Sequence, residues 1–186
     1  MNTTFKRLAT ILVFAFGAAM VTSGQTSAAQ QDGTPPPGVV IDRSPDFQRV
    51  HIGSPSMEIL PDGTYVASHD WFGPAYKTKK ITVVFQSRDK GATWRKISEF
   101  EGQKGSMMFA VGRVLWHIGW CTPGLQGKSA NCIAIRRSDD GGRTWSVPAD
   151  EKSGLLLSEK QYFVDPAPVL FHKGRIWKEV EAVGPK

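Results

Sequence analysis

Side chains that can do chemistry gather in three short stretches of the sequence, each next to a predicted strand. Asp70 contributes a carboxyl group to the first of these stretches. Aromatic side chains beside a carboxylate and a histidine suit the binding of a sugar, because they combine flat apolar surface with polar groups. The ligand-binding candidates are His69, Trp71, Tyr76, Trp120, Tyr162 and Asp165.

Packing explains some of these residues equally well. Trp71 and Trp120 can cap the apolar space between two sheets, and His117, inside an apolar strand, is expected in the core. The sequence carries no metal, nucleotide or flavin signature, so neither a metal nor a cofactor is expected. The candidates therefore have to be judged by the elements that position them.

An internal repeat defines those elements. The pattern S-x-D-x-G-x-T-W occurs at 87–94 and again at 138–145, an offset of 51 residues, and each copy follows an apolar, β-branched run typical of a strand. An apolar hairpin around a glycine precedes each copy. The three hairpins of this kind span 57–66, 107–116 and 168–177.

Each unit of the repeat thus holds four antiparallel strands, the composition of a propeller blade. The sequence predicts an all-β fold, a partial β-propeller of two complete four-stranded blades and the start of a third. A β-sandwich with two similar turns is the alternative. After a linker over 30–50, the propeller fragment is expected over 51–186, with blades at about 54–100, 105–150 and 162–186.

The longer connections are expected on one face of these blades, where loops on a rigid scaffold bind ligands. They span about 70–80, 100–105, 119–131 and 148–162.

The repeated pattern itself is expected to be structural. Its aspartate can bind backbone N–H groups of its own turn, and its glycine permits a backbone angle that other residues resist. Its tryptophan should begin the fourth strand and pack between sheets. The residues concerned are Ser87, Asp89, Gly91, Thr93, Trp94, Ser138, Asp140, Gly142, Thr144 and Trp145.

The two segments resemble the Asp-box, or bacterial neuraminidase (BNR) repeat, of the sialidase superfamily, and the run 59–70 resembles the first blade of its members. The resemblance covers 54–177 and implies a six-bladed type of disc and an exo-α-sialidase-like glycoside hydrolase. It implies that Asp70 is the acid/base. Gly53 and Phe72 stand where the family has arginines that clamp the sialate carboxylate, and its Tyr/Glu nucleophile pair belongs to later blades.

The first 29 residues have the layout of a secretory signal peptide. Lys6 and Arg7 precede an apolar run of about 14 residues, shorter than the roughly 20 that span a bilayer, and small residues precede the cleavage site after Ala29. A membrane anchor is the alternative. Cleavage would yield a secreted or periplasmic protein without membrane association, and would lower the formal net charge from +6 to +4.

Cys121 and Cys132 are an even pair in an exported chain and form the disulfide candidate. A metal pair is less favoured, because no histidines nearby complete a tetrahedral set. The basic residues are dispersed, and the local cluster Lys77, Lys79 and Lys80 is interpreted as a solvated loop. No nucleic-acid partner is expected.

The sequence therefore predicts an exported sialidase-like glycoside hydrolase, or its truncated and inactive remnant, acting on glycans. The alternative is a non-catalytic propeller that binds a glycan or a protein through its loop face, and a structural fragment without a ligand is the third reading. Uncovered blade faces and strand edges favour self-association. A truncated gene product, a piece of a split protein and subunits that close a ring together all fit the length.

Overall fold

The computed structural model describes residues 38–77, 80–121 and 131–184. The predicted signal peptide, the first part of the predicted linker and Lys79 lie outside the described residues, as does most of the loop between the two cysteines. Among the described residues, no helix is long and apolar enough to cross a membrane. The helical turn that they contain is a short 3₁₀ helix at Pro74–Tyr76.

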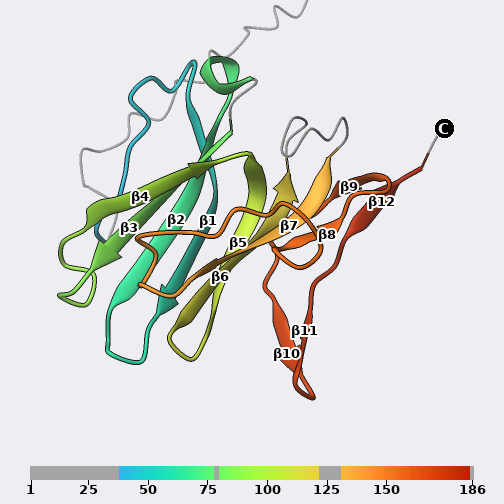
Figure 1. The fold of residues 1–186 in the computed structure, drawn as a ribbon. Coiled ribbons are helices and arrows are strands. Elements are labelled where there is room, and N and C mark those ends of the chain that lie inside the picture. Colours follow the sequence, from blue (N-terminus) through green and yellow to red (C-terminus); the bar gives the residue numbers. More distant parts are fainter. Residues whose placement is uncertain (1–37, 78–79, 122–130, 185–186) are drawn as a thin grey trace, which may run out of the picture. The chain divides into compact units, whose positions relative to one another are not determined.

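The first sheet is antiparallel, and its four strands lie side by side in chain order (Figure 1). They are β1 (His51–Ile59), β2 (Tyr65–Phe72), β3 (Ile81–Ser87) and β4 (Arg95–Glu101). β3 is buried along its whole length, which explains its run of β-branched and aromatic residues. The pairing of β1 with β2 shifts between Gly53 and Ser56, so that β1 carries an irregularity near its beginning.

The second sheet repeats the same order. Its strands are β5 (Gln103–Val111), β6 (Val114–Cys121), β7 (Cys132–Ser138) and β8 (Leu155–Leu157). The registers also agree, because Tyr65 pairs with Ser87 in the first sheet and Leu115 pairs with Ser138 in the second. Two successive four-stranded meanders of equal register are two propeller blades.

A third, smaller group of strands follows. β9 (Gln161–Phe163) pairs with β12 (Glu181–Val183), and β10 (Leu170–His172) pairs with β11 (Arg175–Trp177). Lys173 and Gly174 both have positive φ, 48° and 71°, which is the backbone conformation of a type I′ hairpin turn. This hairpin begins a third unit, and the predicted all-β partial propeller is confirmed.

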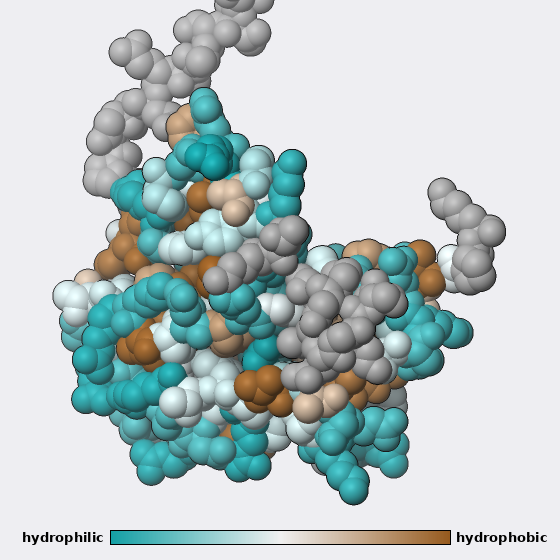
Figure 2. All heavy atoms as spheres, turned by 45° about the horizontal axis from the view of Figure 1, so that its top comes forward, coloured by the Kyte–Doolittle hydropathy of each residue, from teal (hydrophilic) through white to brown (hydrophobic). Residues whose placement is uncertain are grey.

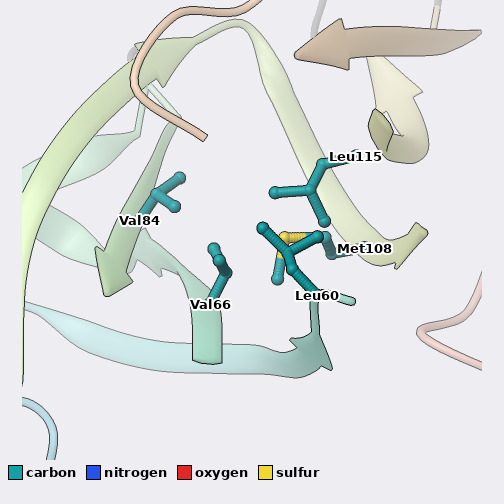
Figure 3. Packing of buried hydrophobic residues seen from close by; sticks show 5 residues of the cluster. All are labelled: Leu60, Val66, Val84, Met108 and Leu115. Atoms are coloured by element: carbon teal, nitrogen blue, oxygen red, sulfur yellow. The ribbon is translucent and has the colours of Figure 1, made fainter. Parts of the chain in front are cut away.

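An apolar cluster joins the first two sheets near their hairpin turns. Leu60, Val66 and Val84 come from the first sheet and its turn, and Met108 and Leu115 come from the second (Figure 3). Each of the five is at most 7% exposed. The two sheets bury these side chains against each other. The burial of apolar surface therefore holds the two blades together.

Two expectations about connections are wrong. The fourth strand of the second sheet begins at Leu155 and not at Trp145, because Pro148 lacks a donor for the ladder and a turn carries the chain away. The chain rejoins the sheet where the Gly154 carbonyl accepts the Ile135 N–H at 2.8 Å. Between β4 and β5 there is no loop over 100–105, since Gly102 alone, at φ +83°, connects the two strands.

Candidate functional site

The two repeated turns, 87–94 and 138–145, have nearly the same internal hydrogen bonds. In the first, the Asp89 carboxylate accepts bonds from the Ser87 hydroxyl at 2.7 Å and from the Thr93 N–H and hydroxyl at 2.9 and 2.6 Å. Hydrogen bonds from Thr93 and Ser87 lower the pKa of Asp89 to about 2. The carboxylate is therefore occupied with its own turn.

The second turn repeats this network around Asp140. Its carboxylate accepts the Ser138 hydroxyl at 2.9 Å and the Thr144 N–H and hydroxyl at 3.0 and 2.7 Å. In both turns the indole N–H of the tryptophan, Trp94 or Trp145, donates to the carbonyl of the glycine three residues before it. The geometry is that of a hydrogen-bonded turn, and it leaves no oxygen of the two carboxylates without a partner.

Asp70 lies near the end of β2, on the face that turns toward the second sheet. The residue is 1% exposed. Its carboxylate accepts the Thr82 hydroxyl at 2.7 Å from β3 and the Gly105 N–H at 2.9 Å from β5. Burial raises the pKa of Asp70 to about 6, although these hydrogen bonds act in the opposite direction. A carboxyl group of this kind is partly protonated in weakly acidic solution.

Lys104 precedes Gly105 at the start of β5 and lies between two aromatic rings. Its ammonium is 4.5 Å from the ring centroid of Phe72 and 5.5 Å from that of Trp120. All three side chains are partly exposed. Burial, and secondarily the positive charge of Lys104, lower the pKa of Lys80. Two ammonium groups and two aromatic rings thus meet at this end of the blades.

A second aromatic group lies on the opposite face of the first sheet. Successive side chains of a strand alternate between faces, so His69 and Trp71 point away from Asp70. The His69 imidazole bonds to Asp42 at 2.8 Å, and the Trp71 and Tyr76 rings lie 5.7 Å apart. The sequence grouped these residues with Asp70 at a single loop, whereas the sheet separates them.

The remaining candidates are dispersed. Tyr162 is 5% exposed and packs with Phe109 in the apolar cluster between the second sheet and the third unit, while its hydroxyl donates to Glu159. Asp165 is exposed, and its main-chain carbonyl accepts the Lys178 ammonium at 2.8 Å. None of these interactions brings Tyr162 or Asp165 to Asp70.

His117 is a core residue. It is 1% exposed, contacts the Ser68 hydroxyl at 3.3 Å and lies edge-on to Phe100 and Trp145. Burial, followed by the positive charge of Arg136, lowers the pKa of His117 to about 3. The imidazole is therefore neutral throughout the physiological range of pH.

Cys121 and Cys132 pair with each other across β6 and β7 and form a disulfide. Both are fully buried in a small cluster with Ala134 and Leu155. The bond fixes the facing ends of β6 and β7, next to Trp120.

Sequence reasoning missed Lys104, Phe72 and Thr82 as neighbours of Asp70. Phe72 was considered only as the replacement for an arginine, and Lys104 carried no motif. A signal was present, because Lys104 opposes Trp120 in the hairpin of the second sheet. The position of that pair beside Phe72 depends on how two separate sheets pack, which no local pattern records.

Neither a protein-family model nor a curated protein matches this sequence. Among solved structures the chain is similar to a Trypanosoma rangeli sialidase, with 14% identity over 63% of this chain and 18% of that one, at a TM-score of 0.40. A GH93 α-L-arabinofuranosidase of Fusarium graminearum, in a complex with arabinobiose, has 18% identity over 75% of this chain and 41% of that one, at a TM-score of 0.46.

A Hadza microbial sialidase, Hz136, has 15% identity over 57% of this chain and 20% of that one, at a TM-score of 0.37. The chain thus spans less than half of the length of each of these proteins. The propeller architecture stands on the strand order and register of the two sheets, independently of these similarities.

Proposed function

We propose that this chain is an exported β-propeller protein that binds a glycan, sialylated or otherwise anionic, at the loop ends of β2, β5 and β6. The observation that carries the proposal is the position of Lys104 between the rings of Phe72 and Trp120. An aromatic ring offers an apolar surface to the C–H face of a sugar, while an ammonium group donates hydrogen bonds to hydroxyl or carboxylate oxygens.

The surrounding charge supports an anionic ligand. Lys80 and Lys104 repel each other, and a carboxylate between them would relieve that repulsion. The resemblance of the two repeated turns to the Asp-box of sialidases supports a glycan as the ligand. The signal-peptide layout of the first 29 residues supports export to a compartment in which glycans occur.

Calorimetric titration of the purified chain with sialyllactose and with lactose tests the proposal. Lys104→Met keeps the apolar stem and removes the charge, and is expected to weaken sialyllactose binding about tenfold, or ~1.4 kcal/mol. Lys96→Met is the matched control, because the Lys96 ammonium lies 5.5 Å from the Trp71 ring on the other face of the sheet. Equal losses in both variants, or none in Lys104→Met, would exclude this site.

Hydrolysis is the second candidate function, and the raised pKa of Asp70 favours it. A general acid has to be protonated near the working pH, and burial places the pKa of this carboxyl at about 6. For a glycosidic oxygen to approach, the hydrogen bond between Asp70 and the Gly105 N–H has to open. Release of fluorophore from a fluorogenic sialoside, lost in Asp70→Asn, would support this role. Turnover that survives in Asp70→Asn would refute it.

A further inference from the structure

The outer face of the first sheet, turned away from the second sheet, is apolar; its β2 and β3 side chains, such as Ala67 and Phe85, are buried, whereas its β1 margin is exposed. Met57 and Ile59 of β1 are 54% and 52% exposed, and Ile52 is 37% exposed. Met57 and Ile52 border a hollow of about 320 Å³, which Ala67 and Phe85 also line. Figure 2 shows apolar groups reaching the surface at several places between hydrophilic ones. We call this surface the outer face.

The repeat identifies what covers a face of this kind. Because the two registers are equal, Ala67 in the first sheet corresponds to His117 in the second. Met57 pairs with Ala67, and Met108 pairs with His117, so Met57 corresponds to Met108. Met108 is 2% exposed and His117 is 1% exposed, because the first sheet packs on them. In this junction the second sheet is covered by the side of the first sheet that faces it. The surface that fits the outer face is therefore the corresponding side of another propeller hairpin.

The third unit presents such a surface. Leu170 pairs with Trp177 and Phe171 pairs with Ile176, so each pair lies on one side of the hairpin. The Phe171 ring contacts the Phe109 ring at 5.7 Å, which directs the pair Phe171 and Ile176 toward the second sheet. Leu170 and Trp177 consequently lie on the far side, 63% and 52% exposed.

The far side of this hairpin corresponds to a covered surface in the second sheet. In the repeat, Trp177 is the counterpart of Trp116 and Leu170 is the counterpart of Phe109. Phe109 and Trp116 pack in the apolar cluster beneath the third unit, where Phe109 is 3% exposed. The chain thus carries both halves of one type of junction, and among the described residues Met57 and Ile59 of one half and Leu170 and Trp177 of the other are exposed.

We propose that the outer face of one copy of this chain binds the Leu170 and Trp177 side of the β10–β11 hairpin of a second copy. The contact repeats between molecules the junction that the first and second sheets form within one molecule. Since the two surfaces differ, the interface is heterologous, and successive copies either close a ring or extend as an open chain.

The N-terminal segment leaves room for this contact. Ile41 and Asp42 line the hollow, and Asp42 bonds to His69, so this segment covers part of the outer face and leaves its β1 margin exposed. Met57 and Ile59 lie beyond it, on the half of the sheet nearer the hairpin turn. The part of the face that is still exposed is the part that corresponds to the apolar cluster between the first two sheets.

Light scattering coupled to size-exclusion chromatography, over a hundredfold range of concentration, tests the proposal with the purified chain. The wild-type protein is expected to form multimers. Met57→Glu blocks the outer face and Trp177→Glu blocks the hairpin, so each variant alone is expected to be a monomer. Each variant retains the half that the other lacks, and an equimolar mixture is expected to form a one-to-one dimer that grows no further.

Val147→Glu is the matched control, because Val147 is 59% exposed and lies outside both surfaces. It is expected to multimerise as the wild type does. Thermal unfolding of each variant separates loss of contact from loss of fold. A monomeric wild type would overturn the proposal. Multimers that persist in Trp177→Glu but are lost in Met57→Glu, with no dimer in the mixture, would show that outer faces pair with each other and would overturn it as well.

Discussion

Replacing Asp70 by asparagine is expected to stabilise the protein at neutral pH and to leave its stability nearly unchanged at pH 4. Burial raises the pKa of this carboxyl from 3.8 to about 6. Because the folded-state pKa lies above the unfolded one, the group's contribution to stability is fully present below about pH 4 and is lost as the pH rises through about 6. The asparagine side chain of the variant carries no charge, so this loss does not occur.

The magnitude follows from the shift. About 2 pKa units, at 1.36 kcal/mol per unit, correspond to about 3 kcal/mol of free energy of unfolding between pH 4 and pH 7. The variant can keep both hydrogen bonds, because an amide oxygen accepts the Gly105 N–H while the amide nitrogen donates to the Thr82 hydroxyl. It therefore imitates the protonated carboxyl.

Urea unfolding followed by tryptophan fluorescence, at half-unit steps from pH 4 to pH 8, measures the difference between the two proteins. Titration of all other groups is common to both and cancels. Asp70→Ala is the control, since it leaves the N–H of Gly105 and the hydroxyl of Thr82 without an acceptor or partner and should destabilise at every pH by about 1–3 kcal/mol. A difference between Asp70→Asn and wild type that does not change with pH would refute the reasoning.

Three further results are expected. Asp89→Ala and Asp140→Ala should each lower the midpoint of thermal unfolding without changing glycan affinity, because each carboxylate bonds only within its own turn; an unchanged midpoint would contradict this. Leu115→Ala, at a site with no exposure, should cost about 2–5 kcal/mol in urea unfolding, and a loss under 1 kcal/mol would mean that the two sheets do not pack as described. Reduction of Cys121 and Cys132, followed by alkylation and mass analysis, should release two thiols and lower stability by about 2–3 kcal/mol; thiols that react without reductant would argue against the bond.

Local sequence patterns predicted well which strands and turns form in this fold. They predicted poorly which side chains share a face of a sheet. The hairpins and the two repeated turns follow from residues close together in sequence, such as the Asp89 network, which needs no tertiary contact. The late start of β8 was missed, because the repeat predicts a strand directly after Trp145, as after Trp94, and the effect of Pro148 was not considered. The repeat predicted a fourth strand directly after Trp145, whereas the strand begins at Leu155, beyond Pro148.

The sequence identified several residues of the candidate site but not how they are arranged in space. Asp70 was identified, but it was grouped with His69 and Trp71, although the alternation of a strand places adjacent residues on opposite faces. Lys104 was missed because its neighbours Phe72 and Trp120 belong to two sheets. A sequence pattern can give the register within a sheet, whereas the packing of one sheet on another depends on all the side chains between them.

The junction between the two sheets is divided into an apolar half and a polar half, and this division connects stability with the candidate site. Near the hairpin turns it holds Val66 and Leu115, whose packing is strong but not directional. Near the loops, buried Arg136 donates to the Gln103 side chain at 3.0 Å and to two main-chain carbonyls, and Gln103 donates onward to the His117 carbonyl.

One of these bonds, from Arg136 to the Glu101 carbonyl, joins the second sheet to the first, and it is directional where apolar contacts would allow sliding. Gln103 is two residues from Gly105, whose N–H reaches Asp70. The Thr82 hydroxyl and the Gly105 N–H hold the carboxylate of Asp70 at this end of the blades. A protein that used this junction only for stability could fill it with apolar side chains, as its other half does. Under the function proposed above, the burial of Asp70 serves to position the ligand site.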